Sequence, residues 1–302
     1  MLDSNRRQYT QSVNMPQMAL TGLSESWLMK EIGDCHWGML CEDLGLKSNE
    51  IFDEEGNRLY ATFVRIKVEG NCSMKDFKEN DQLDISGTIQ RLGSSLYFSE
   101  IDISSHEKVI KCSLATTFST RDSEEDNNKM TKGVPSGGNT GIIKVSKMPD
   151  HILDIVKLKK STIHNISVSD HTFDIMDDVI HETMYKINPY TDINGVGLLY
   201  FAAYPLINDY CELDYFNNNK FSENNWSLSC STMTRDIFYL GNCNLDDIIS
   251  YKLNSYTMIG KDKIAIQSSL FRKSDNFSMA KIFTVKQLIS NCSKNRMLGG
   301  SL

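Results

Sequence analysis

The stretch NDQLDISGTIQRLGSSLYFSEIDISS, residues 80–105, decides the fold predicted for this chain of 302 residues, and LDDIISYKLNSYTMIGKDKIAIQSSLFRK, residues 245–273, repeats its pattern. Each segment has an aspartate just before a strand, a turn with glycine, a second alternating strand and another turn. Alternation of apolar and polar residues over such lengths is typical of half-buried strands. The repeat therefore predicts two units, each built on an antiparallel meander.

Further stretches rich in β-branched and aromatic residues extend each meander to four strands. In the first half the expected strands are 59–68, 82–92, 95–104 and 108–119. In the second half they are 227–239, 247–258, 263–271 and 278–285. A meander of this length needs an apolar partner over its inner face.

One helix in each half is predicted to provide that cover. The first is expected from Ser24, a good N-cap, to Leu44, with Gly45 as its C-terminal stop. The second, predicted over 196–215 within INGVGLLYFAAYPLINDYCELDYF (193–216), is apolar on nearly every side at its start. Pro205 should kink this helix or mark a restart.

Together these elements predict an α+β protein with a double hot-dog fold, in which two curved antiparallel sheets each wrap around a long central helix. The polar segment RDSEEDNNKMTKGVPSGGNTG, residues 121–141, is expected to be an exposed linker. It divides the chain into a first domain, 1–141, and a second domain, 142–302. A single large α+β sheet with two helices is the rival fold.

Composition limits the class of function. Lys and Arg total 32 and Asp and Glu 39, a net charge of −7, which disfavours nonspecific binding to nucleic acid or membranes. The longest apolar run, 196–203, is too short to span a bilayer, and we expect a cytoplasmic protein. The eight cysteines have no C-x-x-C spacing, so we expect no metal site, no disulfide and no cofactor.

Three stretches carry a family resemblance: MPQMALTGLSESWLMKEIGDCHW (15–37), RLYATFVRI (58–66) and DINGVGLLYFAAYPLINDYCE (192–212). They resemble the bifunctional acyltransferase/decarboxylase family of polyketide clusters, to which the leinamycin enzyme belongs. The resemblance implies a double hot-dog enzyme that decarboxylates methylmalonyl-CoA and loads the propionyl group onto the phosphopantetheine thiol of an acyl carrier protein. It also implies that a tyrosine carries the acyl group, and the tyrosine in the matching motif is Tyr60.

The strand pattern puts Tyr60 and Thr62 on one face and Leu59, Ala61 and Phe63 on the other. Tyr60 could therefore reach a cleft between the halves with Thr62 beside it as a substrate-binding residue. An acyl-tyrosine is an aryl ester that a thiol can attack, but a phenol needs a nearby base, a positive charge or a helix N-terminus for activation. A half-buried strand tyrosine that only donates a hydrogen bond is the alternative.

Asn194 and Gly195 are predicted to start the second helix, where unpaired N–H groups would stabilise an enolate formed by decarboxylation. Asn194 would then be catalytic and Gly195 substrate-binding, or the pair would form a simple N-cap. His36, on the first helix beside Trp37, is a candidate proton donor or a structural histidine. The lysines at 157, 159 and 160 form either a solvated face or a contact for CoA phosphates or a carrier protein.

Two other functions stay open: a hot-dog thioesterase or dehydratase, and a noncatalytic module that binds acyl carrier protein. Thioesterases and dehydratases usually place an acidic residue, or a histidine with an acid, at the core helix. Here that place has Asn194, with Asp192 just outside it. The expected partners are methylmalonyl-CoA and a phosphopantetheinylated carrier protein, and a homodimer is one option for assembly.

Overall fold

The computed structural model describes residues 6–121, 126–136, 148–219 and 225–289. Its first half contains β1 (Arg6–Ser12), η1 (Met15–Gln17), β2 (Met18–Ala19), β3 (Gly22–Leu23), α1 (Glu25–Leu44), β4 (Tyr60–Gly70), η2 (Met74–Asp76), β5 (Gln82–Leu92), β6 (Leu96–Ser105), β7 (Lys108–Arg121) and β8 (Met130–Lys132). Its second half contains α2 (Asp150–Lys159), β9 (Asn165–Val168), β10 (His171–Asp174), β11 (His181–Lys186), α3 (Ala203–Asn219), α4 (Trp226–Ser229), β12 (Cys230–Tyr239), β13 (Ile248–Ile259), β14 (Lys263–Arg272) and β15 (Phe277–Leu288). All eight predicted strands are present.

The strands form one continuous sheet, and this corrects the prediction of two separate sheets. Its order is β1-β5-β6-β7-β4-β12-β15-β14-β13-β11, with β8 paired to β7, and each strand pairing described is antiparallel. The two halves meet where β4 pairs with β12 over five residue pairs, from Glu69–Thr234 to Arg65–Phe238. Backbone hydrogen bonds at this seam satisfy two strands that would otherwise be exposed edges.

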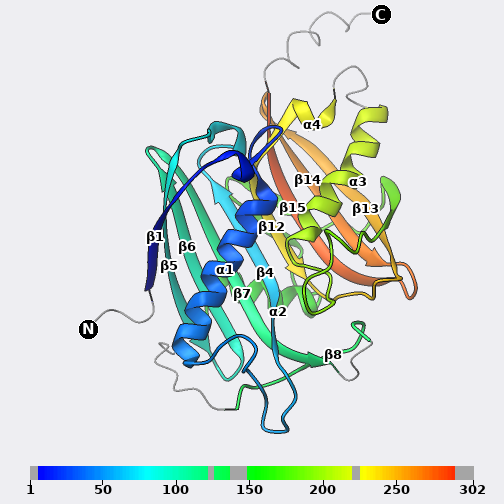
Figure 1. Ribbon diagram of the computed structural model, residues 1–302. Helices are drawn as coiled ribbons and strands as arrows, with labels where there is room; N and C mark the ends of the chain where they lie inside the picture. The colour runs from blue at the N-terminus through cyan, green and yellow to red at the C-terminus, as the bar shows by residue number, and fades with distance from the viewer. Residues whose placement is uncertain (1–5, 122–125, 137–147, 220–224, 290–302) are drawn as a thin grey trace, which may run out of the picture.

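Helix α1 begins and ends where its capping residues predict. The Ser24 hydroxyl accepts a hydrogen bond from the Trp27 N–H, and Gly45 ends the helix with a left-handed φ of 64°. The buried residues of α1 include Leu28, Ile32, Met39 and Leu44, which pack against β5 and β6. This helix therefore covers the meander of the first half, as Figure 1 shows.

Helix α3 begins at Ala203, so the prediction of a helix from Val196 was wrong. The preceding segment is a loop in which Gly197 has a φ of 79° and the Asn194 side chain accepts hydrogen bonds from the N–H groups of Val196 and Leu198. Leu198, Leu199 and Ala202 of this segment are buried by packing of the loop, not of a helix. Pro205 lies in the first turn of α3, where a missing N–H is tolerated.

The segment predicted as an exposed linker contains structure. Within 121–141, strand β8 pairs with the end of β7, and the Asn127 side chain is buried. The Asn127 amide donates to the backbone carbonyls of Gly197 at 2.7 Å and Cys243 at 3.2 Å. Residues 122–125 and 137–141 lie outside the described residues. A polar side chain that bonds to loop carbonyls can be buried, and the polar composition therefore misled the prediction.

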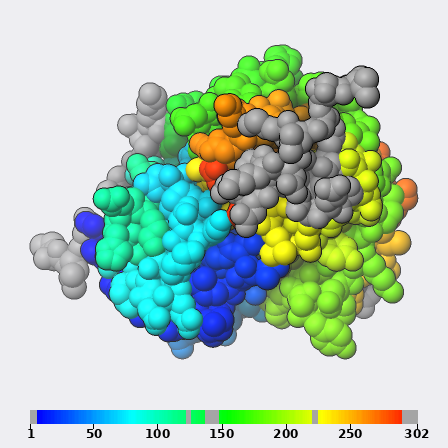
Figure 2. All heavy atoms as spheres, turned by 90° about the horizontal axis from the view of Figure 1, so that it is seen from above, coloured from blue at the N-terminus to red at the C-terminus, as the bar shows by residue number. Residues whose placement is uncertain are grey.

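The elements form layers on the two faces of the sheet. Helices α1 and α3 lie on one face, and α2 lies behind the other (Figure 1). On the α2 side a second core joins Ile152, Ile166 and Phe173 to Phe238 and Phe283 of the sheet. Seen from above, the first half (blue to cyan) and the second half (mostly green to orange) lie side by side (Figure 2). Within the described residues, no helix is both long and apolar enough to cross a membrane.

Candidate active site

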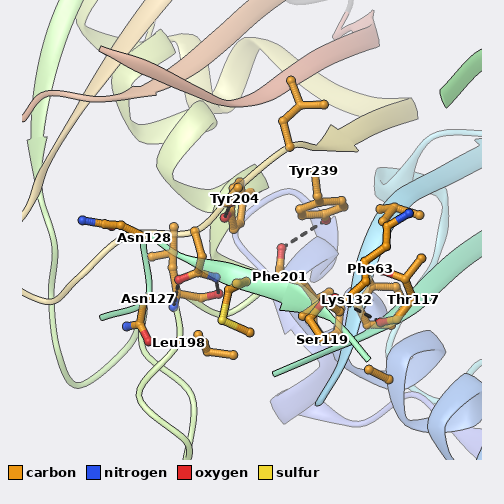
Figure 3. Close-up of a pocket in the computed structure, with 18 of the residues that line it drawn as sticks. Phe63, Thr117, Ser119, Asn127, Asn128, Lys132, Leu198, Phe201, Tyr204 and Tyr239 are labelled. Carbon is orange, nitrogen blue, oxygen red and sulfur yellow. Dashed lines mark hydrogen bonds between the residues drawn. The ribbon is translucent and has the colours of Figure 1, made fainter. Parts of the chain in front are cut away.

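A cavity of about 280 Å³ lies where the seam between the two halves ends. The ladder between β4 and β12 stops at the pair Arg65–Phe238. Beyond that pair, residues 61–64 of β4 and residues 239–242 after β12 line the cavity together with the loop before α3. Figure 3 shows this cavity with residues of both halves around it. The cavity therefore exists because the halves diverge at the end of their shared ladder.

Aromatic side chains form one wall of the cavity. The rings of Phe63 and Phe201 are 4.4 Å apart, and those of Tyr204 and Tyr239 meet edge-on at 4.9 Å. The Tyr204 hydroxyl donates to the Gly241 carbonyl at 2.7 Å, and the Tyr239 hydroxyl donates to the Phe201 carbonyl at 3.2 Å (Figure 3). Burial raises the pKa of both tyrosines well above the ordinary value. They are neutral groups that position the loops.

Asn194 lines the cavity, but not from a helix N-terminus. Its Oδ1 accepts from Val196 N–H at 3.1 Å and from Leu198 N–H at 3.0 Å, and this holds the loop before α3. Its Nδ2 has no hydrogen-bond partner among the described residues and remains available to a ligand. Since α3 begins only at Ala203, the predicted helix-end donors at Asn194 and Gly195 do not exist, and the side-chain amide is the remaining donor.

Tyr60 and Thr62 lie on the same face of β4, next to the same region. Thr62 lines the cavity, and its hydroxyl donates to the Thr117 carbonyl at 3.0 Å. Tyr60 is half-buried and does not line the cavity, and the guanidinium groups of Arg58 and Arg121 each lie 5.3 Å from its ring centroid. Arg121 also donates to the carbonyl of Val196 in the loop that carries Asn194. The structure thus places Thr62 and Asn194 at the same cavity, whereas Tyr60 does not line it and is connected to the Asn194 loop through Arg121.

Gly195 and His36 take other places. Gly195 is exposed, and a methyl group built on it would meet nothing within 4 Å. His36 is fully buried between Ser99 and Thr116, with ring nitrogens 2.6 Å and 2.9 Å from the two hydroxyls. Burial lowers the pKa of His36 to about 3, so the ring is neutral at physiological pH. Both ring nitrogens are engaged, and His36 does not itself line the cavity but packs behind Phe63, with ring centroids 5.4 Å apart, which supports the structural alternative rather than a proton donor.

Sequence reasoning missed the asparagines that shape the cavity. Asn242 accepts from Leu199 N–H at 2.9 Å and donates to the Leu199 carbonyl at 3.1 Å, and Asn127 binds the Gly197 carbonyl. Both fix the loop before α3 from segments far away in the chain. The one sequence feature that could have pointed to these residues is the clustering of asparagine at 127–128 and 242–244. Such clusters ordinarily indicate only a loop.

The residues that line this cavity do not favour general acid–base catalysis by a side chain. Among the described residues that line it, none is aspartate, glutamate or histidine. The polar groups that it offers are amides, hydroxyls and two lysines, Lys132 and Lys159. Across the described part of the chain, no three His, Cys, Asp or Glu side chains converge as a metal site requires.

Comparison with known proteins gives the fold. No family model matches the chain, and no curated protein matches it in sequence. Its structure is similar to that of the 12:0-ACP thioesterase from Umbellularia californica, with a TM-score of 0.61 and 10% identity over 94% of each chain. The chain has a hot-dog fold. An acyl-ACP thioesterase from Bacteroides thetaiotaomicron also matches, with a TM-score of 0.59 and 10% identity over 93% of this chain and 98% of that chain.

Proposed function

We propose that this protein is a double hot-dog enzyme, with units 1–141 and 142–302, that processes acyl thioesters at the cavity beside α3. The specific reaction proposed is decarboxylation of methylmalonyl-CoA and transfer of the propionyl group to an acyl carrier protein in polyketide biosynthesis. The observation that carries the proposal is the chemistry of the cavity wall, which offers a free amide donor and neutral hydroxyls but no carboxylate or imidazole. The resemblance around Tyr60 and Asn194 agrees with this site.

Decarboxylation suits such a wall because it needs no general base. The bond between the α-carbon and the carboxylate breaks, CO2 leaves, and the electron pair passes to the thioester oxygen as an enolate. In this proposal the Nδ2 of Asn194 donates a hydrogen bond to that oxygen. One such donor typically contributes about 2.7–4 kcal/mol to the transition state. A water molecule then protonates the α-carbon and gives the propionyl thioester.

Transfer of the acyl group is assigned to Tyr60. Its phenolic oxygen attacks the thioester carbonyl, the bond to sulfur breaks, and the phenolic proton leaves with the CoA thiol. A carrier-protein thiol then attacks the aryl ester and regenerates the phenol. The guanidinium groups of Arg58 and Arg121 near the ring offer positive charge to the anionic substrate and to the negative charge that develops during transfer.

Thioester hydrolysis is the second candidate, favoured by a separate observation. Glu25, in the first turn of α1, lines another cavity of about 750 Å³. However, its carboxylate is paired with Arg235, from Nε at 2.7 Å and from Nη2 at 2.8 Å. A carboxylate that accepts hydrogen bonds from two nitrogens of one guanidinium group is already engaged and is not free to activate a water molecule. A noncatalytic carrier-protein binder is the third candidate.

One assay separates the three candidates. The protein is incubated with methylmalonyl-CoA and a phosphopantetheinylated carrier protein, and CO2, free acid and loaded carrier are measured together. The proposed function predicts CO2 and propionyl carrier with little free acid. Free acid without CO2 would indicate a thioesterase, and carrier binding with no product would indicate the noncatalytic module.

A further inference from the structure

Two lysines from distant segments reach the same cavity. Lys132 ends the short strand β8, and Lys159 is the last residue of α2, yet both line the cavity beside α3. Both residues are exposed, which places them at its rim. The fold therefore brings two positive charges to the mouth of the proposed thioester site.

Among the described residues, these lysines have no ion-pair partner. Within the described ranges, neither Lys132 nor Lys159 forms an ion pair or a hydrogen bond, although the chain carries a surplus of acidic residues. Lys286, which lines the cavity beside α1, instead contacts Asp209 at 3.0 Å and Glu212 at 2.5 Å. Burial, with a further contribution from Lys132, lowers the pKa of Lys159. A bound anion between the two lysines would relieve this repulsion.

We infer that Lys132 and Lys159 bind a phosphate of the pantetheine arm that acyl-CoA and the acyl carrier protein share. This rests on the proposed function and extends it to the carrier end of the substrate. A phosphate matches two ammonium groups in charge and offers several acceptor oxygens. The carboxylate of the acyl group fits less well, because two cations on it would stabilise the substrate before CO2 leaves and slow that step. Their place at the rim also suits a group outside the acyl cavity.

Binding measurements with two probes that carry no carboxylate test this inference, made in the Tyr60→Phe background so that the propionyl group of neither probe can be transferred to the protein. Propionyl-CoA carries the phosphates, and S-propionyl-N-acetylcysteamine carries the same acyl group without phosphate. Calorimetry should show that Lys132→Met and Lys159→Met each weaken propionyl-CoA binding about tenfold or more, which is the typical effect of losing one charge-assisted hydrogen bond. Binding of S-propionyl-N-acetylcysteamine should stay within about twofold. Lys132→Arg should retain most of the affinity.

Lys160→Met is the matched control, because Lys160 is also exposed but does not line the cavity. It should leave propionyl-CoA affinity unchanged. Unchanged affinity in both cavity variants would overturn the inference, as would a wild-type protein that does not bind propionyl-CoA. Weakened methylmalonyl-CoA binding with intact propionyl-CoA binding would reassign the lysines to the carboxylate. If the lysine dependence holds but no CO2 is released, the phosphate site stands and the proposed decarboxylase function fails.

Discussion

The sheet opens beside a helix at each end of the five-pair ladder that joins β4 to β12, and the two openings differ in chemistry. At the Arg65–Phe238 end, the cavity beside α3 has aromatic rings, amides and unpaired lysines. At the Glu69–Thr234 end, the larger cavity beside α1 contains paired charges, among them Glu25, Asp209 and Lys286. The first opening has two cations without an ion-pair partner among the described residues, whereas in the second the paired charges join the halves.

The pairing beside α1 is a network of five charges. Arg235 on β12 bonds to Glu25 on α1 at 2.7 Å and to Asp209 on α3 at 2.9 Å, and Lys286 on β15 bonds to Asp209 and Glu212. Burial alone would raise the pKa of Asp209, but Arg235 and Lys286 lower it to about 2. The network therefore links both central helices to the sheet.

The largest effect should come from Arg235→Met. It leaves the Glu25 and Asp209 carboxylates without their main cation, and breaking a buried pair in this way typically costs about 3–5 kcal/mol of unfolding free energy. Urea denaturation measures this loss. Arg58→Met, at an exposed arginine beside the other opening, should change stability by less than about 0.5 kcal/mol. Equal losses in the two variants would remove the distinction between the openings.

Asn194→Asp should act on chemistry and spare the fold. The aspartate keeps an oxygen for the N–H groups of Val196 and Leu198 but lacks the Nδ2 donor. CO2 release from methylmalonyl-CoA should fall by about 100-fold, while the urea midpoint stays near that of the wild type. Asn194→Ala should slow CO2 release and also lose stability, because the loop bonds disappear. Wild-type CO2 release from Asn194→Asp would exclude the amide as the enolate donor.

His36 should make the protein less stable in acid. Its pKa is about 3 in the folded state and about 6.5 unfolded, so the unfolded chain binds more protons below pH 6.5. The unfolding free energy should therefore fall as the pH drops from 6.5 towards 3, by about 2 kcal/mol at pH 5 from this group. His151, whose pKa burial also lowers, adds a further decrease. Urea titrations at several pH values should show that the unfolding free energy of His36→Gln falls less steeply with decreasing pH than that of the wild type. An unchanged dependence on pH would contradict the neutral state of His36 in the folded protein.

The smallest effect is expected from Gly195→Ala. The position is exposed, its φ is not in the left-handed region, and a methyl group there meets nothing within 4 Å. Stability should change by less than about 0.5 kcal/mol, and kcat/KM for carrier loading should stay within about twofold. A large loss of kcat/KM with intact stability would instead support the hypothesis that the substrate approaches Gly195 closely.

The sequence predicted the helices and strands that depend on residues within or next to the element itself. Strands β5 and β13 follow from alternation, and the bounds of α1 follow from Ser24 and Gly45. The second helix was predicted to start too early because the apolar run 196–202 suits a buried helix and a buried loop equally. Gly197, with its positive φ, was the sign that the segment turns.

The site was less predictable because its contacts are distant in the chain. Tyr60 was a candidate from the family resemblance, Thr62 from strand alternation and Asn194 from the expected helix start, and the fold places Thr62 and Asn194 at one cavity. No pattern indicates that His36 lies between Ser99 and Thr116. Nor does any pattern bring Lys132 and Lys159 to one cavity. Such pairs depend on the register of the sheet, which local propensity does not determine.

The most direct test of the account is the intact mass of the protein after incubation with methylmalonyl-CoA alone. The proposed transfer through Tyr60 predicts a wild-type mass that increases by one propionyl group, and an increase that disappears when carrier protein is added. Tyr60→Phe should keep the wild-type urea midpoint and gain no mass, with carrier loading reduced by about 100-fold or more. An unmodified wild-type protein that still loads the carrier, or an equal mass increase in Tyr60→Phe, would contradict the covalent role of Tyr60.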